Sequence, residues 1–152
     1  MIEALNLPKA DLRLKRKNGE IFVWCIIRKK ELVCTPEEWV RQHVIHKLIA
    51  ENNIPEGLIA SEYTLNYNGM SKRADVVVFN RNQEPRLIVE CKATKIPITE
   101  ETLFQIAQYN FALKVPYLMM TNGNHHVYCR INQETGGITY LPELPNEVLG
   151  AE

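Results

Sequence analysis

Two apolar runs in the middle of the chain predict a pair of buried strands. The first run, residues 76–79, follows Asp75, and the second, residues 87–89, leads into Glu90. Both are rich in β-branched residues, and the polar segment 80–85 between them has the composition of a tight connection. Because neither run alternates with polar residues, each strand is expected to be buried on both faces. The pattern therefore predicts a β-hairpin at the centre of the molecule.

Two Asn-Gly pairs, at 18–19 and 68–69, mark further turns between strands. Residues 11–25 alternate between apolar and polar positions around the first pair, which predicts an N-terminal β-hairpin. Residues 58–67 predict a strand that turns at the second pair into the central hairpin. Three antiparallel strands should therefore follow one another in the core.

Capping residues mark the starts of two helices. Thr35 is an N-capping residue, Pro36 occupies the first helical position, and Glu38 completes a capping box. Thr99 opens a second helix with two acidic residues in its first turn. The inner stripe of this second helix is predicted to contain Leu103, Ile106, Ala107, Asn110 and Phe111.

The order of these elements predicts an α/β fold with a mixed central β-sheet flanked by helices. A buried strand at 115–120 follows the second helix and precedes another at 126–131, which favours a parallel crossover next to the antiparallel strands. We expect an N-terminal β-hairpin extension at 1–34, a core at 35–131 and a partly ordered polar C-terminal tail at 132–152.

Composition indicates one domain without disulfides. At 152 residues the chain can bury a sizeable core. Its four cysteines lack Cys-x-x-Cys spacing and lie among apolar residues, as free thiols in a reducing compartment do. No secretory pattern opens the chain, and no run approaches the ~18 apolar residues of a membrane span. A cytoplasmic protein without membrane contact is expected.

Charge is balanced overall, with 18 basic and 18 acidic residues, but it is unevenly spread. Residues 1–30 hold eight Lys or Arg against three acids, whereas residues 131–152 hold four Glu and no Lys or Arg. A chain that binds nucleic acid is often basic throughout, so the balance argues against such a partner and the basic clusters argue for it. Arg13, Lys15 and Lys17 would form either a phosphate-contacting strip or the charged outer face of a small hairpin.

The central hairpin brings together residues that suit metal-dependent chemistry. If its turn centres between Asn82 and Gln83, Asp75 faces Glu90. Lys92 shares a face with Glu90, because side chains two apart point the same way along a strand. Two carboxylates so close repel unless a proton or cation lies between them, and their oxygens suit Mg²⁺ or Mn²⁺. Solvated edge charges are the alternative, but the adjacent apolar runs place these residues where unpaired charge is unfavourable.

The central hairpin and the second helix resemble the signature of the PD-(D/E)xK nuclease superfamily. The matching residues are Asp75, then after fourteen residues Glu90-Cys91-Lys92, and the Gln105-x-x-x-Tyr109 element that some branches carry. Within the superfamily the chain resembles the N-terminal nuclease domain of type I restriction enzyme R subunits, and a small stand-alone form of that domain is expected. The resemblance spans roughly residues 35–130, and Ala74 stands where the superfamily has Pro, a position that shapes the backbone.

The resemblance implies a restriction-endonuclease-like core and Mg²⁺- or Mn²⁺-dependent hydrolysis of DNA. Asp75 and Glu90 would hold the ion with the backbone carbonyl of Cys91 as a further ligand, and Lys92 would orient water or stabilise the charge on the phosphate. Gln105 and Tyr109 would line the site. The alternative for this last pair is a surface glutamine beside a core aromatic residue.

The superfamily often carries a further acid on the helix before the hairpin, and Glu37 or Glu38 could supply it. Glu38 is also the capping-box partner, so its structural role is an equal alternative. His43 and His46 lie one turn apart, but no further ligand at zinc spacing follows.

Two other classes of function stay open. The chain could be a non-catalytic nucleic-acid-binding or regulatory module, or an interaction domain that works only with other restriction-system subunits. It contains no Gly-x-x-x-x-Gly-Lys-Ser/Thr phosphate loop, so a whole R subunit with its own motor is not expected. DNA is the expected substrate, although the residues do not distinguish it from RNA, and pairing as a homodimer is left open.

Overall fold

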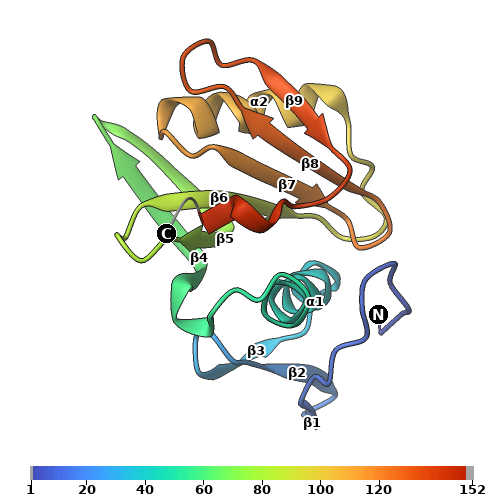
Figure 1. Ribbon diagram of the computed structural model, residues 1–152. Coiled ribbons are helices and arrows are strands. Elements are labelled where there is room, and N and C mark those ends of the chain that lie inside the picture. The colour runs from blue at the N-terminus through green and yellow to red at the C-terminus, as the bar shows by residue number, and fades with distance from the viewer. Residues whose placement is uncertain (1, 150–152) are drawn as a thin grey trace.

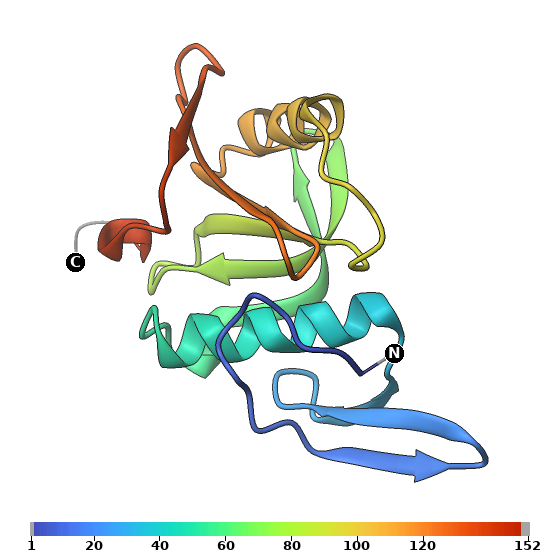
Figure 2. The same ribbon diagram turned by 90° about the vertical axis from the view of Figure 1, so that its right-hand side faces the viewer.

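The computed structural model describes residues 2–149, which form four layers (Figures 1 and 2). A small β-sheet lies against one side of helix α1 (Pro36–Ala50), and the main β-sheet lies against its other side. Helix α2 (Glu100–Ala112) covers the opposite face of the main sheet. Both helices begin where the capping residues predicted, because Thr35 and Thr99 each accept a hydrogen bond from a first-turn amide.

The main sheet has the mixed character expected from the sequence. Within the described chain its strands are β4 (Ile59–Tyr67), β5 (Met70–Phe79), β6 (Pro85–Cys91), β7 (Tyr117–Thr121), β8 (His126–Ile131) and β9 (Ile138–Leu141), hydrogen-bonded in that order. Only the pairing of β6 with β7 is parallel, with α2 as the crossover. The predicted meander and the predicted parallel crossover are both confirmed.

The central strands are apolar throughout because both faces of the sheet are covered. Val76 and Val78 pack in the cluster that includes α1, and Val77 packs in the cluster that includes α2. Each of these three side chains is 0% exposed. The prediction that Phe111 belongs to the inner stripe of α2 is wrong. Phe111 is 39% exposed, and its ring instead lies against Gly136 in the β8–β9 connection.

The small sheet contains one strand more than the predicted hairpin. Its strands are β1 (Leu14–Lys17), β2 (Glu20–Cys25) and β3 (Lys30–Val33), all antiparallel. The turn at Asn18-Gly19 is confirmed, and both residues have positive φ, 53° and 81°. Lys15 and Lys17 each lie 3.7 Å from Glu31 of β3, which favours the charged outer face over a free phosphate-contacting strip.

The segment predicted to be a partly ordered tail is largely structured. Strand β9 pairs with β8 along its length, and a 3₁₀ turn, η2 (Asn146–Leu149), follows. Leu144 and Val148 are buried, and Arg86 Nε donates a hydrogen bond of 2.9 Å to the carbonyl of Val148. The prediction was wrong for 132–149 because these contacts are non-local; residues 150–152 lie outside the described part of the chain.

Over residues 2–149, neither helix combines the length and the apolar character that a membrane crossing requires. The four cysteines are buried free thiols.

Candidate functional site

The candidate site lies where strands β5 and β6 separate. Their backbone pairing ends at Val76 opposite Val89, which is the register that the sequence predicts and which makes Asp75 and Glu90 the next pair. Beyond that point the backbone amides donate to side-chain carboxylates of the other strand instead of to backbone carbonyls. The Asp75 amide donates to Glu90 Oε2 at 3.3 Å, and the Cys91 amide donates to Asp75 Oδ2 at 2.7 Å. The two carboxylates are therefore neighbours at the end of the hairpin.

A change of face along β5 explains why the ladder stops there. Ala74 packs on the α2 side of the sheet and Val76 on the α1 side, although residues two apart normally share a face. Between them, Asp75 lies opposite Glu62 of β4, a residue with φ of 50° that is skipped in the β4–β5 register. The register is the same on both sides of this pair, Ser61 with Val76 and Tyr63 with Ala74, so the irregularity is a one-residue break in the ladder without an inserted residue.

Arg41 joins Asp75 to helix α1. Its guanidinium group is buried, donates to Asp75 Oδ1 and to Glu37 at 2.9 Å each, and also forms an ion pair with Glu38. Burial lowers the pKa of Arg41, but the charges of Glu38 and Asp75 outweigh that effect and raise it. Arg41 was not among the predicted site residues. Its spacing of three and four residues from two acids on the same helix was the available signal.

Glu38 is held inside this network rather than in a capping box. Thr35 Oγ1 accepts the Glu38 amide at 3.0 Å, as expected for an N-cap. The Glu38 carboxylate does not complete the box: Arg41 binds it, and Gln42 Nε2 donates to it at 2.9 Å. The charges of two predicted catalytic groups act on Glu37: burial and the charge of Asp75 raise its pKa, while Arg41 and Lys92 lower it.

Lys72 holds Glu90 from the other side. Its ammonium group donates to Glu90 Oε1 at 2.7 Å and lies 5.6 Å from the centre of the Tyr109 ring. Burial raises the pKa of Glu90, and the hydrogen bond from Lys72 opposes that rise. Tyr109 and the exposed Gln105 line a surface hollow of about 540 Å³ with Met70. Tyr109 thus reaches the carboxylates through Lys72.

Lys92 directly follows β6, and its amide donates to the carbonyl of Thr121 at 2.8 Å. Its half-buried ammonium group lowers the pKa of Glu37, and it makes no hydrogen bond or ion pair within residues 2–149. The neighbouring Cys91 thiol is fully buried, and burial raises its pKa, so this side chain is a structural residue. Within the described residues, Lys92 is therefore a cation of the site that no hydrogen bond or ion pair holds.

The oxygen donors of Asp75 and Glu90 fit a hard cation such as Mg²⁺, which proteins typically hold with one or two carboxylates plus water and substrate phosphate. Residues 2–149 contain no group of three or more His, Cys, Asp or Glu side chains clustered as metal ligands. All four carboxylate oxygens accept hydrogen bonds, two of them from the cations Arg41 and Lys72. A divalent ion would have to weaken or replace those two contacts.

Comparison with known proteins identifies the family. Residues 36–145 match the model of the type I restriction enzyme R protein N terminus. The chain belongs to this family. The matched segment of the R protein N-terminal family runs from α1 to beyond β9, contains Asp75, Glu90 and Lys92, and leaves the small sheet outside. The resemblance found in the sequence is therefore confirmed, and the mixed sheet flanked by helices is the fold class that it implied.

No curated protein matches the chain. Among solved structures, it is similar to the fragment structure of a putative HsdR subunit of a type I restriction enzyme from Vibrio vulnificus YJ016, at 25% identity with a TM-score of 0.41. The match covers 60% of this chain and 19% of that chain, so the present chain spans at most about a fifth of its length. At that TM-score the superposition adds nothing to the family assignment.

Proposed function

We propose that this R protein N-terminal family member is a nuclease that hydrolyses phosphodiester bonds of DNA with the help of Mg²⁺ or Mn²⁺. The observation that carries the proposal is the juxtaposition of Asp75 and Glu90 at the end of a buried hairpin. The ammonium group of Lys92 acts on the neighbouring Glu37 and makes no hydrogen bond or ion pair within residues 2–149. Family membership supports the same assignment.

In this proposal each residue has a distinct role. Asp75 and Glu90 would hold the ion, which when bound would supply a polarised phosphate and a water of lowered pKa. Lys92 would bind a phosphate oxygen and stabilise the negative charge that builds up during attack. Arg41 would keep the Asp75 carboxylate in position through its 2.9 Å contact, and Tyr109 would fix the neighbouring Lys72.

A second candidate function is a non-catalytic nucleic-acid-binding or regulatory module of a restriction complex. The observation that favours it is that Arg41 and Lys72 already neutralise the two carboxylates without any added ion. In that case the charged cluster would be a structural network, and activity would belong to partner subunits. Other restriction-system subunits are proposed partners under either function.

The first test is a nuclease assay on supercoiled, linear duplex and single-stranded DNA with Mg²⁺, Mn²⁺ or a chelator. Lys92→Ala should lower the cleavage rate at least about 100-fold, because it removes a charge that acts on the transition state. The matched control is Lys95→Ala, an exposed lysine of the same loop. Melting curves of both variants should match the wild type.

Cleavage by Lys92→Ala at the rate of Lys95→Ala would exclude the proposed role of Lys92. If wild type cleaves none of the substrates, alone or after addition of the other restriction subunits, the regulatory module is favoured. Sedimentation of the wild type with and without duplex DNA would test the proposed pairing of two copies.

A further inference from the structure

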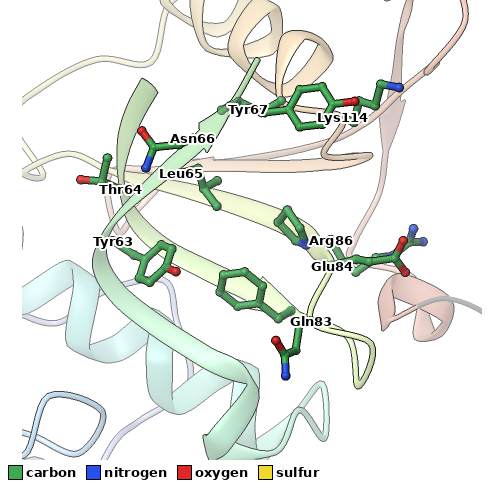
Figure 3. Close-up of a pocket in the computed structure, with 12 residues that line it drawn as sticks. Tyr63, Thr64, Leu65, Asn66, Tyr67, Gln83, Glu84, Arg86 and Lys114 are labelled. Atoms are coloured by element: carbon green, nitrogen blue, oxygen red, sulfur yellow. The ribbon is translucent and has the colours of Figure 1, made fainter. Parts of the chain in front are cut away.

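A second hollow lies on the α2 side of the sheet, between the edge strand β4, the β5–β6 turn and the end of α2 (Figure 3). Its volume is about 470 Å³, which is within the range of small-ligand sites. We call it the tyrosine hollow, after the residues that matter below: Tyr63, Leu65, Tyr67, Phe79, Arg86 and Lys114.

Partly exposed aromatic rings line the tyrosine hollow. Tyr63, Leu65 and Tyr67 share one face of β4 because they lie two residues apart. Leu65 is buried, whereas Tyr63 is 44% exposed and Tyr67 38% exposed. The Tyr63 ring meets the Phe79 ring edge-on, with the ring centres 5.4 Å apart. Partly exposed aromatic rings are surfaces on which another flat ring can stack.

Two cations stand at the rim of the same hollow. The Lys114 ammonium group lies 5.4 Å from the centre of the Tyr67 ring. Figure 3 shows the two side chains next to each other. Arg86 also lines the hollow, and its guanidinium group is fixed by a hydrogen bond to the carbonyl of Val148 and lies 5.8 Å from the centre of the Tyr117 ring. The one acid in the lining, Glu84, accepts a hydrogen bond from Asn80 at 2.9 Å. Aromatic platforms beside fixed cations are the combination that binds single-stranded nucleic acid.

The tyrosine hollow is connected to the candidate nuclease site by a row of contacts. Tyr67 pairs with Met70 across the β4–β5 turn, and Met70 lines the neighbouring hollow with Tyr109. Tyr109 in turn contacts Lys72, which binds Glu90. The tip of the β4–β5 hairpin stands beside α2 in both ribbon views (Figures 1 and 2), so the two hollows share one side of the molecule.

We propose that the tyrosine hollow binds an unpaired nucleotide of single-stranded DNA that continues from the cleavage site. In a duplex each base covers its faces with its neighbours, so only an unpaired base can stack on Tyr63 or Tyr67. Lys114 and Arg86 would contact the adjoining phosphates. This inference rests on the proposed nuclease function, because the strand that reaches the hollow would be the DNA bound at the cleavage site.

The test measures binding of a labelled thymidine oligonucleotide of about 15 residues by fluorescence anisotropy in a chelator, where no metal-dependent cleavage can occur. Tyr67→Ala should weaken binding about tenfold through loss of stacking, whereas Tyr67→Phe should bind like the wild type. Lys114→Gln should weaken binding and reduce its dependence on salt. The matched control is Tyr140→Ala, which removes a 55% exposed tyrosine from β9 at the other edge of the sheet.

The inference is overturned if wild type does not bind the oligonucleotide, or if Tyr67→Ala and Lys114→Gln bind as tightly as Tyr140→Ala. Failure of the nuclease proposal is a separate result, because it is read from the Lys92→Ala cleavage assay. Loss of binding in the hollow variants without any wild-type cleavage would support the binding site and reject the nuclease.

Discussion

Arg41 is the cation that the acids on the α1 side of the candidate site share. One guanidinium group serves three carboxylates, and its side chain is only 6% exposed. Lys72 has the corresponding position at Glu90, where it is 17% exposed. These two contacts allow the protein to fold with two neighbouring carboxylates before any ion is bound, since unneutralised buried charges would oppose folding.

We predict that Arg41→Ala lowers the free energy of unfolding by about 3–5 kcal/mol, because it leaves Glu38 and Asp75 without their cation. Urea unfolding followed by circular dichroism measures this change. Arg16→Ala, which removes an exposed arginine from β1, is the control and should change the free energy by less than about 0.5 kcal/mol. Equal unfolding midpoints for the two variants would show that the Arg41 network does not stabilise the fold.

A second prediction concerns Glu90, whose pKa is raised by burial. The folded protein keeps a proton on Glu90 at pH values where the unfolded chain has lost it, so the folded state binds more protons in that range. The stability that Glu90 contributes is therefore largest below its unfolded pKa and falls as the pH rises through the raised folded pKa. Glu90→Gln cannot lose a proton, so its free energy of unfolding relative to the wild type should rise from pH 4.5 to pH 7.

Urea unfolding at several pH values measures that difference, with Glu101→Gln on the exposed start of α2 as the matched control. A change with pH no larger for Glu90→Gln than for Glu101→Gln would contradict the prediction.

At this scale the sequence predicted part of the site. The register of the hairpin follows from local pattern and turn position, so the pairing of Asp75 with Glu90 could be predicted. Arg41 reaches Asp75 only because α1 packs on a particular face of the sheet. Contacts of that kind depend on how elements distant in the sequence pack together. Neither secondary-structure propensity nor hydrophobic periodicity encodes that packing.

At the scale of elements, the sequence predicted the features that neighbouring residues determine, namely helix starts and turns. The capping threonines fixed the starts of both helices, and Asn-Gly pairs fixed two turns. The strands that were missed, β3 and β9, have four residues each and are mostly exposed. Such strands form because a neighbouring strand already offers an unpaired edge, which is a tertiary effect rather than a sequence signal.

The irregularity at Glu62 belongs to the same class of features. A glutamate at φ of 50° in the middle of a nine-residue strand cannot be foreseen from its neighbours. It nevertheless determines where β5 changes face and hence where Asp75 points. The element that creates the site was predicted, but the irregularity that shapes it was not.

At the scale of the whole molecule, the order of strands and helices was enough to predict a mixed sheet flanked by helices. The four-layer arrangement was not predicted. The small sheet packs on α1 through a cluster that contains Val23, Cys34 and Trp39, and no sequence pattern indicates which element these residues contact. This layer buries the outer side of α1, which in turn holds Arg41 at the end of the main sheet. The geometry of the site thus depends on every layer between the small sheet and α2.

The last prediction follows from that dependence, because an ion held between β5 and β6 binds the folded chain and not the unfolded one. Mg²⁺ or Mn²⁺ at about 100 times its dissociation constant should add about 2.7 kcal/mol to stability, which corresponds to a rise of roughly 5–10 °C in Tm for a chain of this size. Thermal scans should be run with a short DNA duplex, since Mg²⁺ is often shared with substrate phosphates.

Using the Lys92→Ala variant as the background keeps the duplex intact during the scan. Adding Asp75→Asn should abolish the rise, and adding Asp11→Asn, an exposed acid near the small sheet, should preserve it. An equal rise in both double variants would place the ion elsewhere, and no rise in the Lys92→Ala background would favour the regulatory module.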